Sequence, residues 1–278
     1  MPVTCAAPRT LPDPPPPTSA AAGPLSGRTA VILHAHPDDE AIFTAATAHR
    51  LAREGARVVL VTATAGELGP VLRPLGAGET LAQRRRAELE RAAELLGVAR
   101  LVLLGHRDSG MAGWADNSHP DALAAADHGA LARRLADICG AESAEALVHY
   151  DPAGIYGHPD HLAVHRIGAE AATLAGVTGY EATVPRDGRR VGRRAHLVDV
   201  AAAGGAVGWD SAGIATEVRA DAADLAAKRA AMAAHASQVP RFATRRTGFA
   251  DTYGREWYRR AGVPGLLDEV ATAAGRSR

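Results

Sequence analysis

The stretch Ala30-Val31-Ile32-Leu33-His34-Ala35-His36-Pro37-Asp38-Asp39-Glu40 decides how this chain folds. Its first four residues are apolar and predict a buried strand, while the Ala-rich residues after it have the spacing of a helix. Between strand and helix stand two imidazoles and three carboxylates, with a proline that stiffens the turn. Packing alone does not explain so many ligand-type groups in one turn. We therefore expect a chemical site at the carboxyl end of a strand.

A second cluster of the same kind, Tyr156-Gly157-His158-Pro159-Asp160-His161, follows another apolar run at residues 146–150. His and Asp are ordinary ligands of divalent metals, and a catalytic zinc usually has three protein ligands and one open position. The first cluster needs a further ligand from elsewhere in the chain. We predict that the second cluster supplies it.

Outward from these clusters, the chain alternates between strand and helix patterns. Strands are predicted at 30–33, 58–62, 101–104 and 146–150, and helices at 41–54, 81–96, 122–139 and 162–174. This order predicts an α/β fold with a Rossmann-like, open, mostly parallel sheet flanked by helices. In such sheets ligands bind beyond the carboxyl ends of the strands, which is where both clusters fall. No G-x-G-x-x-G turn follows the first strand, so the nucleotide-binding turn is missing.

The two ends of the chain have weaker patterns. Residues 1–28 are rich in Pro and Ala and predict a disordered extension, which leaves 29–278 as a single domain. Asp187-Gly188 resembles a hairpin turn between 181–186 and 189–200. A helix is predicted at 221–236, followed by an irregular segment, 239–258, whose Trp257 and Tyr258 pack back on the body.

The composition favours a cytoplasmic protein that acts on a small molecule. Basic and acidic residues number 31 each, so no net field attracts nucleic acid or an anionic membrane. Cys5 and Cys139 lie far apart, which argues against a disulfide framework and fits a reducing compartment. The apolar runs are too short for a membrane-spanning helix. We expect no nucleic-acid or membrane partner, and a homo-oligomer is compatible with the sequence.

The pairing of the motif at 36–40 with the motif at 157–161 resembles the zinc-dependent N-deacetylases. That family includes the N-acetylglucosaminyl-phosphatidylinositol deacetylases, the LmbE-like proteins and the deacetylases of the mycothiol and bacillithiol pathways. The resemblance covers residues 29–174 and, more loosely, 235–238. Arg85 with Glu88-Leu89, and the segment 107–111, are similar to the mycothiol branch, which contains a deacetylase and an S-conjugate amidase.

The resemblance implies that His36, Asp39 and His161 bind the metal and that Asp38 is the general base. The chemistry of the residues agrees, because a metal-activated water needs a neighbouring carboxylate that is not committed to the metal. Two imidazoles and one carboxylate suit Zn²⁺, and the same set accepts Fe²⁺ or Co²⁺.

The resemblance further implies that His158 is the charged partner of the transition state and that Tyr156 helps to hold the oxyanion. An imidazolium at His158 could stabilise the oxyanion or donate a proton to the departing amine. Asp160 could hydrogen-bond an imidazole and fix its tautomer. The family would place Asp160 beside His158.

Substrate-binding residues are predicted on the loops above the strands. Arg85 grips an anionic or hydroxyl-rich group in this reading, although it stands in a basic run typical of a solvated helix face. Asp108 is a sugar-hydroxyl acceptor or a turn former, and Glu67 lies on a Gly/Pro-rich loop.

Two residues of the first cluster have other expected roles. His34 is predicted to be a buried, hydrogen-bonded residue of the sheet rather than a metal ligand. For Glu40 two roles stay open, namely orienting a ligand or interacting with the N-terminus of the following helix.

The predicted reaction is metal-dependent hydrolysis that removes an N-acetyl or other N-acyl group from an N-acetylglucosaminyl conjugate. Two alternatives are amide hydrolysis of a mycothiol S-conjugate and deacylation of a glycosylated natural product. The short, Pro/Gly-rich segment at 68–80 departs from the mycothiol deacetylase pattern and keeps these alternatives open. A sugar-binding protein that has lost catalysis is the non-enzymatic alternative.

Overall fold

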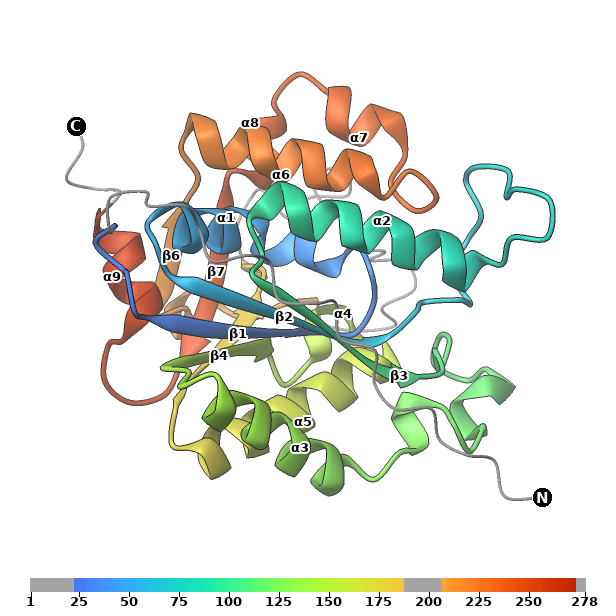
Figure 1. Cartoon of the computed structure of the whole chain (residues 1–278), viewed down its shortest axis with the longest axis horizontal. Helices are drawn as coiled ribbons and strands as arrows, with labels where there is room; N and C mark the ends of the chain where they lie inside the picture. The colour runs from blue at the N-terminus through green and yellow to red at the C-terminus, as the bar shows by residue number, and fades with distance from the viewer. Residues whose placement is uncertain (1–22, 188–206, 274–278) are drawn as a thin grey trace.

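The computed structural model describes residues 23–187 and 207–273, which form a seven-stranded sheet covered by helices on both faces (Figure 1). The strands are β1 (Thr29–His34), β2 (Arg57–Thr64), β3 (Arg100–His106), β4 (Ala146–Tyr150), β5 (Thr178–Thr183), β6 (Thr216–Arg219) and β7 (Arg255–Arg260). The longer helices are α1 (Ala45–Arg53), α2 (Leu81–Leu96), α3 (His128–Ala141), α5 (Pro159–Ala175), α6 (Ala222–Ala234) and α9 (Leu266–Ala273). The short helices are α4 (Gly154–Gly157), α7 (Arg241–Arg245) and α8 (Phe249–Tyr253).

The sheet has the order β3-β2-β1-β4-β5-β7-β6. The first five strands in this order are parallel, while β7 pairs antiparallel with both β5 and β6. The predicted α/β class with a mostly parallel sheet is therefore confirmed. From β1 the chain continues to β2 on one side and returns as β4 on the other, so the topological switch point lies between β1 and β4.

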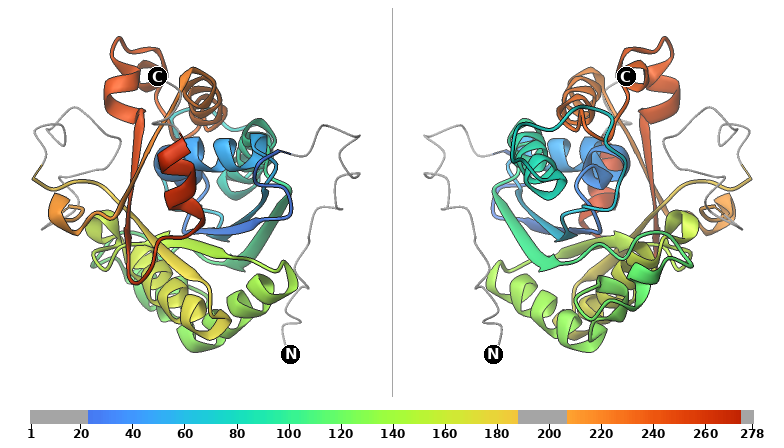
Figure 2. Two further views of the ribbon diagram at one scale, coloured as in Figure 1. Left: turned by 90° about the vertical axis from the view of Figure 1, so that its left-hand side faces the viewer. Right: turned by 90° about the vertical axis from the view of Figure 1, so that its right-hand side faces the viewer.

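Helices α1, α2 and α6 cover one face of the sheet, and α3 and α5 cover the other (Figures 1 and 2). All six residues of β1 are buried, as expected for a central parallel strand with helices on both sides. Local signals define helix α2, because Thr80 and Gln83 form a capping box at its start. Gly97 ends this helix in the left-handed conformation at φ 74°.

The structure corrects the predicted helix at 122–139. The α-helix begins only at His128, where the Asp127 side chain accepts a hydrogen bond from the backbone of Ala130. The residues before it form a 3₁₀ turn at Leu123–Ala125. The apolar spacing of 122–126 reflects burial of that turn, in which Ala122 and Leu123 are both buried.

The prediction of an irregular segment at 239–258 is wrong, because this segment contains α7, α8 and most of strand β7. A short antiparallel strand depends on its neighbours for pairing and therefore has a weak local signature. Tyr258 is buried, and its hydroxyl lies 2.6 Å from Thr47 Oγ1, so its packing on the body is confirmed. The predicted hairpin at Asp187-Gly188 extends into residues outside the described part of the chain.

Residues 23–28, predicted as part of a disordered extension, are folded onto the body. Leu25 is buried in the hydrophobic core, and its backbone N–H donates to Glu54 O at 2.9 Å. The Arg28 side chain bonds Glu145 at 2.5 Å and Glu269 at 3.2 Å. One apolar side chain and one cation therefore order a segment whose composition suggested disorder.

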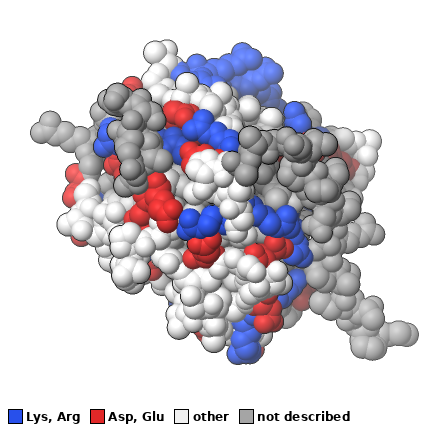
Figure 3. Space-filling view, turned by 60° about the vertical axis from the view of Figure 1, so that its left-hand side comes forward, with Lys and Arg blue, Asp and Glu red and all other residues white. Residues whose placement is uncertain are grey.

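Acidic and basic side chains are interspersed over much of the face shown in Figure 3. This mixture is in keeping with the balanced charge of the whole chain. Among the described residues, no helix combines the length and the apolar character needed to cross a bilayer.

Candidate metal centre

The two His/Asp clusters meet at the switch point of the sheet. Strands β1 and β4 are adjacent and parallel, with Ile32 opposite Val148, so the loops that leave their carboxyl ends lie side by side. His36, Asp39 and His161 each offer a ligand atom, and these three atoms lie within 4.8 Å of one another. All three residues are buried. The structure thus brings the three predicted metal ligands together.

The orientation of His36 is set by a carboxylate on each side of its ring. Nε2 lies 3.1 Å from Asp160 Oδ2, and Nδ1 lies 3.5 Å from Asp39 Oδ2. Burial would lower the pKa of His36, but hydrogen bonds to Asp108, Asp160 and Asp39 raise it well above its usual value. A metal that displaces the Nδ1 proton would leave the tautomer whose proton is on Nε2, shared with Asp160. This tautomer is the one that a metal between His36 and Asp39 requires.

Asp39 and His161 complete the three-residue group. Burial alone would raise the pKa of the Asp39 carboxyl, but the nearby His161 and His36 rings hold that pKa well below its usual range. His161 Nε2 lies 3.4 Å from Asp39 Oδ2, and its ring stacks on Tyr150 with the centroids 4.4 Å apart. The other nitrogen, Nδ1, is buried without a hydrogen-bond partner. A buried set of two imidazoles and one ionised carboxylate fits a divalent metal such as zinc.

Asp38 stands beside this group in a strained conformation. Its φ of 103° is rare for a residue other than glycine, and such strain is typical of functional positions. Burial raises the pKa of the Asp38 carboxyl to about 6, against the opposing effect of the Arg85 cation. Arg85 Nη2 lies 3.3 Å from Asp38 Oδ2. This carboxylate is close to the metal-type group without belonging to it.

His158 and Tyr156 approach the group from the β4 side. Burial lowers the pKa of His158 to about 3, with a further contribution from His36 and His161. The backbone N–H of Asp160 donates to His158 Nδ1 at 3.1 Å, so the ring proton resides on Nε2. The resting ring is therefore a neutral donor; the charged form implied by the resemblance belongs to the transition state.

The hydroxyl of Tyr156 lies 3.4 Å from His161 Nε2. Burial raises the pKa of this phenol well above its usual value, so the hydroxyl keeps its proton and can donate it in a hydrogen bond.

Asp160 makes its imidazole hydrogen bond to His36, whereas the family resemblance suggested His158 as the neighbour. Its other oxygen accepts from Ser109 Oγ, and the backbone N–H of Ser109 donates to Oδ2 at 3.0 Å. His158 is still close, because ligand atoms of His36, Asp108, His158 and Asp160 form a second group within 4.8 Å. Ser109 lies in the segment 107–111 that carries part of the family resemblance, but no role was predicted for it, and only the fold shows that it holds Asp160.

His36 and Asp39 line a cavity of about 520 Å³, together with Asp38, His158 and two of the three predicted substrate residues, whereas His161 is not among its lining residues. Arg85 lines it but is buried, and it donates to the backbone carbonyls of Gly66 and Pro37. Asp108 lines it too, and accepts from Gly110 N at 2.8 Å and Leu68 N at 3.2 Å. Glu67 is not among the lining residues, because its carboxylate lies behind Asp108 and accepts from that backbone N–H at 3.1 Å.

The two remaining residues of the first cluster have structural contacts. His34 is buried with both ring nitrogens paired, each at 2.8 Å, to Tyr150 and Thr44, which confirms its predicted structural role. Glu40 bonds His235 Nε2 at 2.5 Å and accepts from the backbone N–H of Asp38 at 3.0 Å. Glu40 thus holds the turn that carries Asp38 and connects it to His235, a contact that neither of its two predicted roles includes.

The segment 235–238 closes the site from the far end of the chain. Besides the contact of His235 with Glu40, the Ser237 hydroxyl donates to Glu88 at 2.6 Å and Gln238 donates to Pro70 O at 2.7 Å. The sequence marked this segment only through a loose family resemblance and assigned no role to it. Its contacts are with residues about 150 to 195 positions away, which no local pattern reveals.

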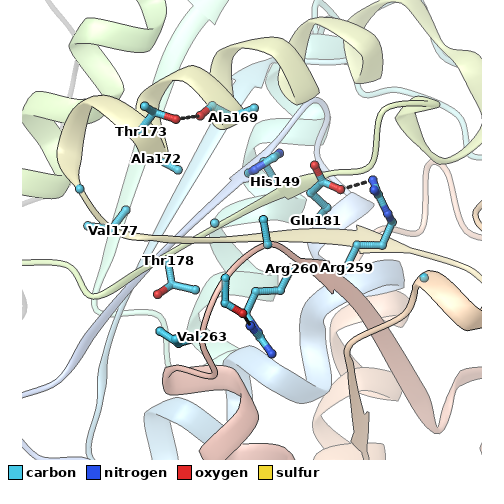
Figure 4. A pocket seen from close by; sticks show the side chains of 15 residues that line it. His149, Ala169, Ala172, Thr173, Val177, Thr178, Glu181, Arg259, Arg260 and Val263 are labelled. Atoms are coloured by element: carbon cyan, nitrogen blue, oxygen red, sulfur yellow. Dashed lines mark hydrogen bonds and ion pairs between the residues drawn. The ribbon is translucent and has the colours of Figure 1, made fainter.

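A second cavity, of about 500 Å³, lies between α5, β5 and β7 (Figure 4). His149, Glu181 and Arg259 line it, and Glu181 is paired with Arg259. Neither of the two metal-type groups among the described residues is located there. We therefore place the reaction chemistry in the first cavity.

Burial of His149 is expected to lower the stability of the folded protein at acid pH. Burial lowers its pKa to about 3, and its Nδ1 lies 3.0 Å from Tyr150 O. Between the folded-state pKa and the unfolded-state pKa of about 6.5, the imidazole of His149 is protonated in the unfolded chain but stays neutral in the folded protein. Above pH ~6.5 His149 therefore does not change the free energy of unfolding. Below that pH it lowers this free energy by about 1.4 kcal/mol per pH unit.

We expect His149→Gln to reduce the slope of the free energy of unfolding against pH between about pH 6 and 4. The reduction corresponds to at most one proton fewer taken up on unfolding. Urea titrations of chelator-treated protein at several pH values measure the slope. The absolute stability of the variant does not matter for this comparison. Equal slopes for the variant and the parent would contradict the assignment.

The fold and this cluster define the protein as an α/β protein with a His/Asp metal-type site at the switch point of its sheet. Residues 31–172, slightly more than half of the chain, match the family model described as PIG-L, GlcNAc-PI de-N-acetylase, and the chain belongs to this family. The match ends before the segment 235–238 that closes the site.

Curated relatives resemble the same region. The 1D-myo-inositol 2-acetamido-2-deoxy-alpha-D-glucopyranoside deacetylase of Kineococcus radiotolerans is 44% identical over 147 residues, which is 47% of this chain and 41% of the relative. The enzyme of the same name from Thermobifida fusca is 43% identical over 144 residues, or 48% and 50% of the two chains. This chain thus matches about half the length of these relatives.

Solved structures share the fold across most of the chain. The A40926 pseudoaglycone deacetylase superposes with a TM-score of 0.57 at 18% identity, covering 84% of this chain and 96% of its own. The N,N'-diacetylchitobiose deacetylase of Pyrococcus horikoshii gives 0.55 at 20% identity, with coverages of 84% and 83%. A 4-carboxy-2-hydroxymuconate hydratase from Pseudomonas putida gives 0.54 at 18% identity, with coverages of 86% and 98%. The fold alone therefore does not specify the reaction.

Proposed function

We propose that this protein is a metal-dependent N-deacetylase that acts on an N-acetylglucosaminyl conjugate. The observation that carries the proposal is the position of Asp38, a carboxylate whose pKa burial raises to about 6, beside a buried group of two imidazoles and one carboxylate. A hydrolase needs such a base within reach of a metal site. The family match and the names of the curated relatives support the choice of an acetylated amino sugar.

In this proposal His36, Asp39 and His161 hold the metal, with zinc as the first choice and Fe²⁺ or Co²⁺ compatible with the same ligands. When bound, such an ion lowers the pKa of a water and polarises an amide carbonyl. Asp160 keeps His36 in the required tautomer through the 3.1 Å contact with Nε2.

Asp38 accepts the proton of the attacking water. Its pKa of about 6 leaves it mostly ionised at neutral pH yet basic enough to take a proton. Arg85, at 3.3 Å, favours the ionised form before the reaction. The same carboxyl, once protonated, can return the proton to the departing amine.

His158 and Tyr156 stabilise the negative charge that develops on the amide oxygen. Both are neutral donors at rest, since His158 carries its proton on Nε2 and the Tyr156 phenol stays protonated. Preorganised donors in a buried site are effective because they need no reorganisation when the charge appears. In this assignment His158 donates a hydrogen bond to the oxyanion, and Asp38 accepts and returns the proton.

The particular substrate follows from the relatives by analogy. Their name specifies a glucosaminide of myo-inositol, and two of the compared structures are deacetylases of a pseudoaglycone and of diacetylchitobiose. An amidase acting on an S-conjugate is the second candidate within the same chemistry. Both candidates keep the small-molecule partner and the cytoplasmic location expected from the sequence.

Acetate release tests the proposal. We expect protein reconstituted with Zn²⁺ to release acetate from the inositol glycoside of N-acetylglucosamine or from free N-acetylglucosamine. Amide hydrolysis of an S-conjugate of the thiol type, the second candidate, would instead be detected by the free amino sugar that it leaves. A chelator should abolish the release, and added Zn²⁺ should restore it, since three protein ligands hold the ion reversibly. Fully metallated protein that releases no acetate from either acetylated sugar would refute the proposed deacetylase, and cleavage of the S-conjugate alone would favour the amidase.

A further inference from the structure

The residues lining the first cavity divide into a polar inner part and an apolar rim. The buried residues are His36, Asp39, Asp108, His158 and Arg85. The rim contains Leu68 and Pro70 from the loop after β2, and Met111 and Trp114 from the loop after β3. Leu68 and Met111 are half-buried, while Pro70 and Trp114 are exposed. A substrate that reaches the catalytic group therefore passes between two apolar loops.

Trp114 is the largest of these rim side chains, and 48% of it is exposed. Its ring lies over Gly110, where a β-carbon would come within 2.5 Å of Trp114 Cε3. Gly110 has a φ of 67°, so both its backbone conformation and the approach of the indole exclude a larger residue. An exposed indole fixed over glycine presents a flat apolar surface at the mouth of the cavity.

The loops that carry the rim are held by hydrogen bonds. The Asn117 side chain donates to Ser109 O at 2.6 Å and Met111 O at 3.1 Å and accepts from Gly113 N at 3.0 Å. On the other side, Leu68 N donates to Asp108 at 3.2 Å, which ties this loop to the metal-type group. The apolar rim is therefore preorganised, which lowers the entropic cost of binding.

Exposed apolar groups continue outward along the first loop. Val71 and Leu72 follow Pro70 directly and are 51% and 45% exposed. Leu72 N donates to Ser237 O at 2.9 Å, so this stretch too is attached to the body. Exposed apolar groups that gather beside a cavity are typical of a ligand-binding surface.

We infer that the rim of the cavity, with Trp114 as its main contact, binds an apolar substituent of the substrate. The substituent is either the aglycone attached to the anomeric carbon of the sugar or a long N-acyl chain attached through the amide. This inference rests on the proposed function for the position of the amide and goes beyond it by specifying an amphiphilic amino-sugar conjugate.

Binding of three ligands tests this inference without requiring turnover. They are the methyl and octyl glycosides of N-acetylglucosamine and the methyl glycoside of N-octanoylglucosamine, each below its micelle-forming concentration. Calorimetric titrations use zinc-loaded Asp38→Asn protein, so that no ligand is consumed. We expect one of the octyl ligands to bind at least about tenfold more tightly than the methyl N-acetyl ligand. The preferred octyl ligand shows whether the rim binds the aglycone or the acyl chain.

Adding Trp114→Ala to the Asp38→Asn protein should lower the affinity for the preferred octyl ligand about tenfold. The affinity for the methyl N-acetyl ligand should stay the same. Trp114→Phe should retain most of the preference, because it keeps an apolar ring. Phe242→Ala removes an exposed aromatic that does not line the cavity and serves as the matched control. Equal affinity for all three ligands, or a preference unchanged by Trp114→Ala, overturns the inference. Failure of acetate release alone would count against the proposed function and leaves this comparison of affinities valid.

Discussion

The substitution Asp38→Asn is expected to lower kcat for acetate release by about 10²–10⁴-fold with the metal content unchanged. The amide of asparagine keeps the size of the side chain but cannot accept a proton from water. Asp38 is not one of the three residues grouped as metal ligands, so the ion should still bind. Because the base acts in the transition state, kcat should fall much more than KM rises.

Metal analysis of the purified variant, together with steady-state kinetics, measures both quantities. Asp121→Asn, at an exposed carboxylate whose side chain is 81% accessible, is the matched control and should retain full activity. Retention of more than about a tenth of the parent kcat in Asp38→Asn would assign the base to another group. Loss of the metal instead would make Asp38 a ligand.

The second large effect concerns a buried ion pair that joins three elements of the fold. Lys228 of α6 lies with its Nζ 2.6 Å from Glu256 Oε1 on β7, and both side chains are only 1% exposed. The Glu256 carboxylate also accepts from the backbone N–H groups of Ala46 and Thr47, each at 2.8 Å, at the start of α1. The cation and the helix N-terminus together neutralise this buried carboxylate.

Lys228→Met is expected to lower the free energy of unfolding by about 3–5 kcal/mol, because it leaves the Glu256 charge without its cation. The double substitution Lys228→Met with Glu256→Gln should recover part of this loss, since no charge then remains buried. Urea unfolding followed by circular dichroism measures all three proteins. A single variant within about 1 kcal/mol of the parent would show that the helix N-terminus alone suffices for Glu256.

Most of the parallel half of the fold was predictable from local patterns. β-branched and apolar runs between Gly-ended helices indicated β1, β2, β3 and β4, and central parallel strands have strong signals because both their faces are buried. The antiparallel edge was not predictable in the same way. Strand β6 has only four residues and β7 follows two short helices, so the pairing of β7 with β5 and with β6 depends on contacts between distant segments.

The sequence by itself determined the chemical groups of the site. Two dense His/Asp clusters, each placed directly after a strand pattern, are enough to single out His36, Asp38, Asp39, His158 and His161. Such information is local, because ligand type and strand pattern are both written in a few consecutive residues.

Only the tertiary structure decided how these groups are arranged and supported. In the folded protein β4 lies beside β1, and Asp160 hydrogen-bonds His36. The backbone N–H of Asp160 sets the neutral tautomer of His158, and His235 hydrogen-bonds Glu40. Each of these contacts joins parts of the chain whose proximity or geometry depends on sheet order and side-chain packing. The physical reason is that strand pairing and burial depend on contacts between segments that are distant in sequence, and no short stretch of sequence determines those contacts.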